Sequence, residues 1–262
     1  MVEILLANGA DVNSNDYEFK KTPILIAVEN NSNKVIDILY SHGADINVYD
    51  DEGRGVLYYA ARTNNVEKAE FFISHGLDLN KDPSKVTKAL IVAVRNNRRE
   101  MVEFLISHGA NVNPADGENE GPLHYAIEDD NASIAELLIS HGADLNAIFC
   151  CSRTYLQYAV CKKAYEVTKL LISHGSDIHK INYYGQTLLH TAARNGDEKM
   201  AEYLISLGLD VNAKDQDGQT ALHASAYKNS VMCHNYLYHM ALILKRRIIQ
   251  AKQHYILQKN IS

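Results

Sequence analysis

Histidines recur at a fixed interval and are the first residues in the sequence that could do chemistry. Each lies 33 residues from the next and is followed three residues later by an acidic or amide side chain; they are His42, His75, His108, His141 and His174. Imidazole and carboxylate groups bind zinc or transfer protons. However, the ligands of one zinc ion lie about 2 Å from it, whereas equivalent positions on neighbouring packed helices are about 10 Å apart. We therefore predict that these histidines lie at helix ends, where a protonated imidazole favours the negative end of the helix dipole.

The cysteines are the second group that could do chemistry. Cys150 and Cys151 are adjacent, Cys161 follows ten residues later, and Cys233 stands apart. If the intervening residues form a helix, Cys161 lies about 10 Å along it from the other two, which is too far for a shared metal ion. Four cysteines in a chain of this length do not make a disulfide framework, so we interpret them as reduced thiols.

Motifs of the common enzyme classes are missing from the sequence. There is no glycine-rich phosphate loop, no HExxH and no nucleophile elbow. Neighbouring carboxylates occur at residues 50–52 and 128–130, where solvated loops or helix ends are the usual explanation. The sequence therefore predicts no catalytic residue, no metal ion and no cofactor.

The repeated histidines belong to a longer repeated segment that must position them. The segment LLISHGADLN at 137–146 has close copies whose glycines are spaced 34 residues once and then 33 residues five times, namely Gly9, Gly43, Gly76, Gly109, Gly142, Gly175 and Gly208. Self-similarity at this period is typical of a solenoid, in which each short unit packs only on its neighbours. The length of such a chain therefore reflects the number of its repeats and not the size of one compact core.

Two helices are predicted in each repeat. The first begins at positions spaced 33 residues apart, namely Thr22, Gly55, Lys88, Gly121, Thr154, Thr187 and Thr220. Thr22 with Pro23 has the chemistry of a helix start, because a hydroxyl can cap a free N–H and proline suits the first helical position. Nine residues later come residues suited to a left-handed turn, namely Asn31, Asn64, Asn97, Asp130, Lys163, Gly196 and Asn229. The second helix follows and ends at the Ser-His-Gly unit, whose glycine supplies the left-handed cap.

This pattern resembles the ankyrin repeat family, and in particular the Asn-rich SHGADIN-type arrays of some protists. The family signature T-P-L-H-x-A is matched in part by Thr22, Pro23 and Ala27, by Leu123, His124 and Ala126, by Leu189, His190 and Ala192, and by Leu222 and His223. The resemblance implies an all-α ankyrin solenoid of stacked helix-turn-helix units with hairpin-like loops.

Departures from the family pattern concentrate in the middle repeats. Leu25, Tyr58, Ile91 and Gln157 replace the signature histidine, and Lys88 with Ala89 replaces Thr-Pro. The resemblance also implies an aspartate and a glycine in the loop before each first helix. Asp50 with Gly53 and Asp215 with Gly218 keep both, Asp116 keeps the acid alone, and Gly185 keeps the glycine alone. Residues 81–85 and 148–152 keep neither, so we expect these two loops to be irregular.

The register divides the chain into a partial repeat and successive complete ones. The predicted boundaries are 1–15 for a second helix alone, then 16–49, 50–82, 83–115 (degenerate), 116–148, 149–181 (degenerate), 182–214, the start of a last repeat at 215–235, and a divergent segment at 236–262. Ile4, Leu5 and Leu6 lack the first helix that would cover them. We therefore expect the chain to be part of a longer array.

The last residues depart from the repeat pattern and carry the opposite charge. The chain has a net charge of −6, whereas residues 241–262 hold five basic and no acidic residues, so the preceding residues carry −11. Apolar residues three or four apart predict a basic amphipathic helix there, covering the last repeat. Binding to a membrane surface or a partner groove and a frame-shift origin are alternatives. The acidic balance predicts no nucleic-acid partner, and the sequence favours a monomer in the cytoplasm, with a nuclear location also compatible.

The resemblance implies that partner contacts come from the hairpin tips and the exposed end of the first helix. Carried over by register, the positions are Glu18, Phe19, Lys21, Glu29, Asp51, Glu52, Arg54, Arg62, Lys85, Arg95, Glu118, Glu120, Glu128, Asp129, Tyr183, Tyr184, Gln186, Arg194, Gln216, Asp217, Gln219, Tyr227 and Lys228. A non-catalytic scaffold for protein binding is the predicted function. The alternatives are a regulatory or targeting segment of a larger enzyme or adaptor, and a membrane-peripheral protein held by the basic tail.

Overall fold

The computed structural model describes residues 1–79, 83–113, 121–149 and 153–226, which form short helices. Their bounds are α1 Val2–Ala7, α2 Pro23–Glu29, α3 Asn33–Ser41, α4 Val56–Thr63, α5 Val66–Ser74, α6 Pro83–Arg95, α7 Arg99–Ser107, α8 Pro122–Glu128, α9 Ala132–Ser140, α10 Tyr155–Lys162, α11 Tyr165–Ser173, α12 Leu188–Asn195, α13 Glu198–Ser206 and α14 Ala221–Ala226. The predicted all-α repeat fold is confirmed. None of these described helices is long and apolar enough to cross a membrane.

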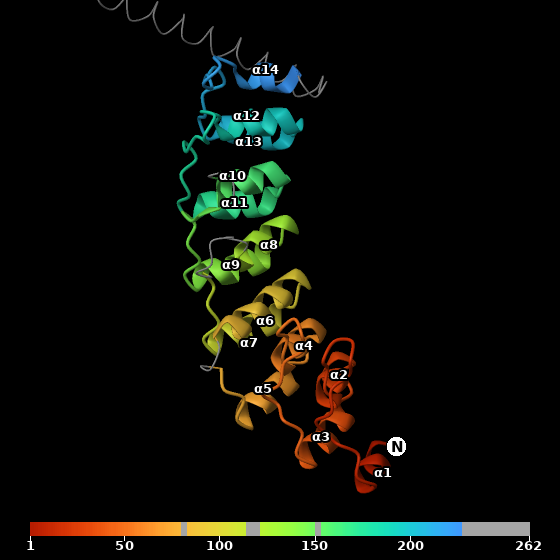
Figure 1. Cartoon of the computed structure of the whole chain (residues 1–262). Coiled ribbons are helices and arrows are strands. Elements are labelled where there is room, and N and C mark those ends of the chain that lie inside the picture. The colour runs from red at the N-terminus through yellow and green to blue at the C-terminus, as the bar shows by residue number, and fades with distance from the viewer. Residues whose placement is uncertain (80–82, 114–120, 150–152, 227–262) are drawn as a thin grey trace, which may run out of the picture. The chain divides into compact units, whose positions relative to one another are not determined.

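The chain divides into two compact units, whose helices are labelled in Figure 1. The first contains residues 1–126 and 131–144, and the second contains residues 127–130 and those from 145 onward. In the first unit α2 packs on α3 and α4, and α4 packs on α5 and α6. In the second unit α10 packs on α11 and α12, and α12 packs on α13 and α14. Each unit is thus a run of helix pairs that contact their sequence neighbours.

A few register positions supply the core of every pair. In the first helix of a pair the position five residues after the register start is a buried alanine, as in Ala60, Ala93 and Ala192, whose small side chains let the helices approach closely. In the second helix the equivalent buried positions are large, namely Leu39, Phe72, Leu105, Leu138, Leu171 and Leu204. Burial of a side chain of this size contributes roughly 1.5–3 kcal/mol. The residues shared among repeats are therefore used for packing.

Most first helices begin where the register predicts. Helices α2, α4, α8, α10, α12 and α14 each begin one residue after the predicted start. The prediction that the Thr22 hydroxyl caps a helix is wrong, because that hydroxyl is buried without a hydrogen-bond partner. Thr154 does cap α10, in a reciprocal arrangement with Gln157, and the imidazole of His190 accepts the N–H of Thr187. A capping box thus forms where the side chain of the third helical residue can accept a hydrogen bond from the backbone N–H of the N-cap residue.

Helix ends also follow the prediction. The left-handed turn residues Asn31, Asn64, Asn97, Asp130, Lys163 and Gly196 all have positive φ, as do the glycines of the Ser-His-Gly units. Asn229 lies outside the described residues. Each repeated histidine is the C-cap residue of its second helix, and Nδ1 of His42 lies 2.8 Å from the Ile38 carbonyl oxygen. The imidazoles therefore add a further hydrogen bond at a carbonyl of the last helical turn; the Ile38 carbonyl oxygen, for example, also accepts from the backbone N–H of His42.

The start of α6 corrects a prediction. The register predicts that this helix begins at Lys88 after an irregular loop that includes Lys85, but it begins at Pro83 and contains both lysines. Proline suits the first helical turn, and the residues that follow contain no glycine or other helix breaker until Arg95. The degenerate repeat therefore gains a longer first helix, and residues 80–82 lie outside the described part of the chain.

The loop before α10 is more regular than predicted. Strand β1, Ile148–Phe149, pairs antiparallel with β2, Arg153–Thr154. Ile148 stands opposite Thr154, and the equivalent residues three repeats (99 positions) earlier, Tyr49 and Gly55, form the same antiparallel bridge. Backbone pairing therefore joins the two described ends of this loop without the family's Asp and Gly. Residues 150–152 lie outside the described structure, so the prediction is not tested for Cys150 and Cys151.

Asparagine side chains link some of the loops to the next one. Asn13 donates to the carbonyl of Gly43 at 3.2 Å and accepts from the N–H of Asp45 at 2.9 Å. Asn113 makes the same pair of bonds to Gly142 and Asp144, at 2.7 and 2.8 Å. In both places a side chain of one repeat satisfies backbone groups of the following repeat.

The apolar residues of α1 are exposed, as the sequence predicts. Ile4 is 63% exposed and Leu5 is 54% exposed. Leu5 lines an open groove of about 550 Å³ together with Ile26 and Val35. This groove lies where a preceding first helix would pack in a complete repeat.

Candidate functional site

The candidate site is described within each unit separately and comprises the loops before the first helices and the solvent-exposed sides of those helices, namely α2, α4, α6, α8, α10 and α12. We call these surfaces together the helix-one face. Phe19 is 40% exposed there, and Arg95 and Arg194 are exposed. Glu118, Glu120, Tyr227 and Lys228 lie outside the described residues, as does the predicted basic helix at 236–262. For these the predictions stay untested.

Three of the predicted contact residues bind one another. The carboxylate of Glu29 on α2 accepts from Lys21 at 2.6 Å and from Arg62 on α4 at 2.7 Å. Lys21 and Arg62 also lie over the ring of Tyr59, 5.1 and 5.3 Å from its centroid. Burial alone would raise the pKa of Glu29, but the hydrogen bonds from Lys21 and Arg62 outweigh it, so the pKa is lowered. These charges are largely satisfied within the chain.

A second buried carboxylate organises the loop before α4. Asp50 accepts hydrogen bonds from the backbone of Glu52 at 3.0 Å and Arg54 at 2.8 Å, from Arg54 Nε at 2.7 Å, and from the Tyr59 hydroxyl. Burial favours the neutral acid, yet the bonds from Tyr59 and Arg54 lower the pKa of Asp50. Burial and the neighbouring carboxylate raise the pKa of Tyr59. We call Lys21, Glu29, Asp50, Arg54, Tyr59 and Arg62 the charge network.

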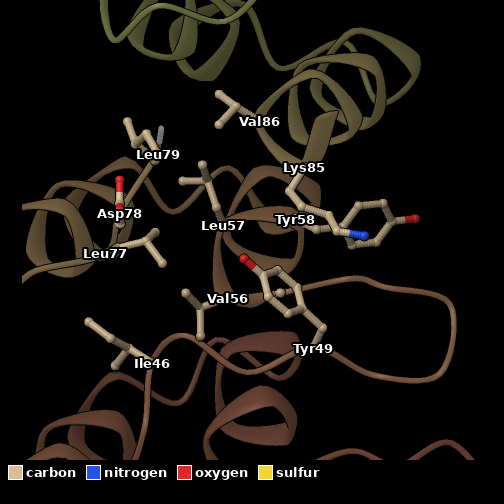
Figure 2. Close-up of a pocket in the computed structure, with 11 residues that line it drawn as sticks. Ile46, Tyr49, Val56, Leu57, Tyr58, Leu77, Asp78, Leu79, Lys85 and Val86 are labelled. Atoms are coloured by element: carbon tan, nitrogen blue, oxygen red, sulfur yellow. The ribbon is translucent and has the colours of Figure 1, made fainter. Parts of the chain in front are cut away.

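A small cavity lies beneath this loop. Figure 2 shows the ring of Tyr49 and the side chain of Lys85 on one side and Leu77 on the other. Its volume of about 20 Å³ is room for one water molecule and excludes a larger ligand. The Lys85 ammonium lies 5.3 Å from the centre of the Tyr49 ring. The extra turn of α6 thus packs against the preceding hairpin and fills most of the space.

Beside the charge network, α4 and α6 border a larger groove of about 430 Å³. We call it the cationic groove; its lining residues are Tyr58, Arg62, Lys88, Ile91, Val92, Arg95 and Asn96. The Arg95 guanidinium lies 5.0 Å from the centre of the Tyr125 ring. Lys88 Nζ lies 3.4 Å from the Glu52 carbonyl oxygen. Three of the seven lining residues are cationic and none is acidic.

In the second unit the helix-one face includes two well-exposed aromatic residues. Tyr183 is 74% exposed and Tyr184 is 62% exposed, and their rings meet edge to face with centroids 5.5 Å apart. Asn182 holds the turn that carries them by accepting from the N–H groups of Tyr184 at 3.0 Å and Gln186 at 2.9 Å. The Gln216 side chain donates to the Tyr183 carbonyl at 3.0 Å. A fixed backbone therefore presents two exposed rings.

Glu128 is paired within the second unit. Its carboxylate accepts from the Tyr158 hydroxyl at 2.8 Å and from Lys162 Nζ at 2.7 Å. Burial and the bond to Glu128 raise the pKa of Tyr158 to about 12. The pKa of Lys162 is raised chiefly by its bond to Glu128. This acid is therefore engaged with its own chain.

Some structural partners escaped the sequence reasoning. Tyr59, Tyr158 and Lys162 were not among the predicted positions, although each bonds to a carboxylate of the preceding loop or helix. A usable signal was present, because Glu29 and Arg62 are opposite charges exactly one repeat apart. Asn182 takes the role of the missing loop aspartate, since an amide oxygen accepts the same turn hydrogen bonds. Asp16 does so in the first loop.

The histidines and carboxylates do not converge on a metal site in the described part of the chain. There, no cluster of three or more histidine, cysteine, aspartate or glutamate side chains has a geometry that could hold an ion. Cys161 is a free, partly buried thiol whose sulfur lies 3.8 Å from an Arg153 guanidinium nitrogen.

Comparison with known proteins identifies the repeat. A family model described as "Ankyrin repeats (3 copies)" matches residues 1–83, 78–149 and 156–246. Two putative ankyrin repeat proteins of fowlpox virus (strain NVSL) are each 36% identical over 73 residues, which is 28% of this chain and 11% and 17% of the viral proteins. The B-cell lymphoma 3 protein homolog of Mus musculus is 37% identical over 60 residues, covering 23% of this chain and 13% of the mouse protein. The matched segments are thus a small part of these relatives.

Proposed function

The chain belongs to the ankyrin repeat family, and from that premise we propose that it is a non-catalytic scaffold that binds a partner protein through the helix-one face. Ankyrin repeats are in general protein-interaction modules, whereas the partner and the residues that contact it are specific to each chain. The proposal includes Phe19, Arg95, Tyr183, Tyr184 and Arg194 as contacts. The cytoplasmic location and the monomeric state stay predictions.

The exposed pair Tyr183 and Tyr184 is the observation that carries this proposal. Exposed aromatic rings are costly to leave in water and are frequent anchors of protein interfaces. Their loop is fixed by Asn182 and Gln216, so little conformational entropy is lost when a partner covers them. Register positions that build the core and caps are alike among repeats, whereas the residues at the loop positions of Tyr183 and Tyr184 differ from repeat to repeat.

The test compares captured partners. The full chain is crosslinked and purified beside a variant with Arg95, Tyr184 and Arg194 changed to alanine. A matched control changes Glu70, Glu103 and Glu202, which are exposed on second helices. We expect the helix-one variant to lose partners that the control keeps. If the captured proteins are the same for all three chains, this face is not the binding surface.

A second candidate is a regulatory or targeting segment of a larger protein. It is favoured by the small fraction, from 11% to 17%, that the matched segments form of the three relatives above. A continuous reading frame upstream of the first codon in the transcript supports it, and an in-frame stop codon there counts against it. Membrane binding by residues 241–262 concerns residues outside the described structure, and loss of liposome flotation on deleting them is its test.

A further inference from the structure

The cationic groove carries charges that the described residues of the chain do not neutralise. Within the described residues, Arg95 and Lys88 form no ion pair; Arg95 contacts the Tyr125 ring, and Lys88 contacts a backbone carbonyl. Arg62 reaches Glu29 through one guanidinium nitrogen, which leaves the other side of its planar group available. Cations placed close together repel one another, so a cluster of them without counter-ions is unfavourable by itself. It is therefore suited to a negatively charged ligand.

The early start of α6 sets the distance between the two cations that this helix contributes to the groove. Because the helix begins at Pro83, Lys88 lies inside it and not at its end. Lys88 and Arg95 are seven residues apart, so they lie on one face about 10 Å apart along the helix axis. Ile91 and Val92 lie between them and provide an apolar floor. Lys88 and Ile91 stand where the family has threonine and histidine, so the residues that depart from the family pattern are those that line the groove.

We propose that the cationic groove binds an acidic segment of a partner protein, in which two carboxylates four residues apart flank an apolar side chain that lies two residues from each. In an extended segment, residues two and four apart face the same side, and the two carboxylates are separated by about 13 Å, a span that the long side chains of Lys88 and Arg95 can reach. The intervening apolar side chain would lie on Ile91 and Val92. A nucleic acid suits this site less, because the cations are few and the remainder of the chain is acidic. This inference rests on the proposed function and specifies the chemistry of the partner.

The experiment selects peptides from a random library displayed on phage, with the full chain as bait. We expect the enriched peptides to carry aspartate or glutamate at two positions four apart. The affinity of a labelled synthetic copy, measured by fluorescence anisotropy, should fall about tenfold for a Lys88→Ala/Arg95→Ala double variant and should weaken with added salt. Arg98→Ala is the matched control, because Arg98 is exposed in the same repeat but outside the groove.

The outcomes separate this inference from the proposed function. Enriched peptides without an excess of acid, or acidic peptides that bind the double variant equally well, overturn the acidic-segment proposal while protein binding stands. Binding that requires phosphoserine in place of the carboxylates also overturns the acidic-segment proposal and leaves protein binding standing. If no peptide is enriched, the acidic-segment proposal is overturned, and the capture experiment decides the proposed function separately. Circular dichroism and thermal unfolding confirm that all variants keep the fold.

Discussion

The charge network and the cationic groove lie side by side in the first unit, share Arg62, and use their charges differently. In the charge network, Glu29 and Asp50 each receive several hydrogen bonds from neighbouring side chains and backbone. In the cationic groove, Lys88 and Arg95 receive no carboxylate from the described chain. The difference indicates that similar residues at similar register positions serve stability in one repeat and are available for binding in the next.

The largest expected difference between the two regions concerns Asp50. Asp50→Ala removes the acceptor of the buried Tyr59 hydroxyl and of Arg54, and should lower the free energy of unfolding by about 3 kcal/mol. The measurement is urea unfolding followed by circular dichroism. Asp51→Ala, at an exposed neighbouring carboxylate, should change it by less than about 0.5 kcal/mol. Equal effects of the two substitutions would show that the network is not structural.

Acid should weaken the charge network selectively. The pKa values of Glu29 and Asp50 are lowered by folding, so their stabilisation is complete above the ordinary carboxyl pKa and is lost as the pH falls through the lowered values. We expect the urea midpoint to decline below about pH 4.5. The decline should be shallower in a Glu29→Gln/Asp50→Asn variant, and Lys88→Met should follow the wild-type curve. Parallel curves for all three proteins would contradict the interpretation.

Glu29→Gln sharpens the comparison at a partly exposed pair. It removes the charge shared by Lys21 and Arg62 and should cost about 1 kcal/mol, since solvent screens part of the interaction. The effect should decrease in high salt. A double-mutant cycle with Arg62→Met measures the coupling, and a coupling near zero would show that this carboxylate is dispensable.

The smallest effect is expected in the cationic groove. Lys88→Met and Arg95→Met should each change the free energy of unfolding by less than about 0.5 kcal/mol, because neither removes an ion pair seen in the described residues. Loss of like-charge repulsion could make the double variant slightly more stable. Thermal unfolding measures this directly. Destabilisation comparable to that of Glu29→Gln would mean that Lys88 and Arg95 stabilise the fold. The cationic groove would then not differ from the charge network in this respect.

The sequence predicts helix ends better than it predicts charge partners. Gly142 and Asn64 determine their turns locally, because few residues tolerate a left-handed backbone, and both predictions are confirmed. The start of α6 was mispredicted because a register inferred from other repeats overrode the local signal of Pro83. Of the positions proposed for binding, Lys21, Glu29 and Arg62 engage one another, which depends on how adjacent repeats pack. Contacts of the other, exposed positions depend on the surface of the partner as well as on the sequence of this chain.

The asparagine links have a consequence for how such a gene can change. Asn13 and Asn113 bond to the main chain of the following copy, to a carbonyl and an N–H that nearly every amino acid possesses. A duplicated or deleted 33-residue segment therefore meets the same acceptor and donor whichever copy becomes its neighbour. Recombination between copies can therefore alter the length of the array and the order of its exposed residues while the hydrogen bonds between neighbouring repeats stay the same.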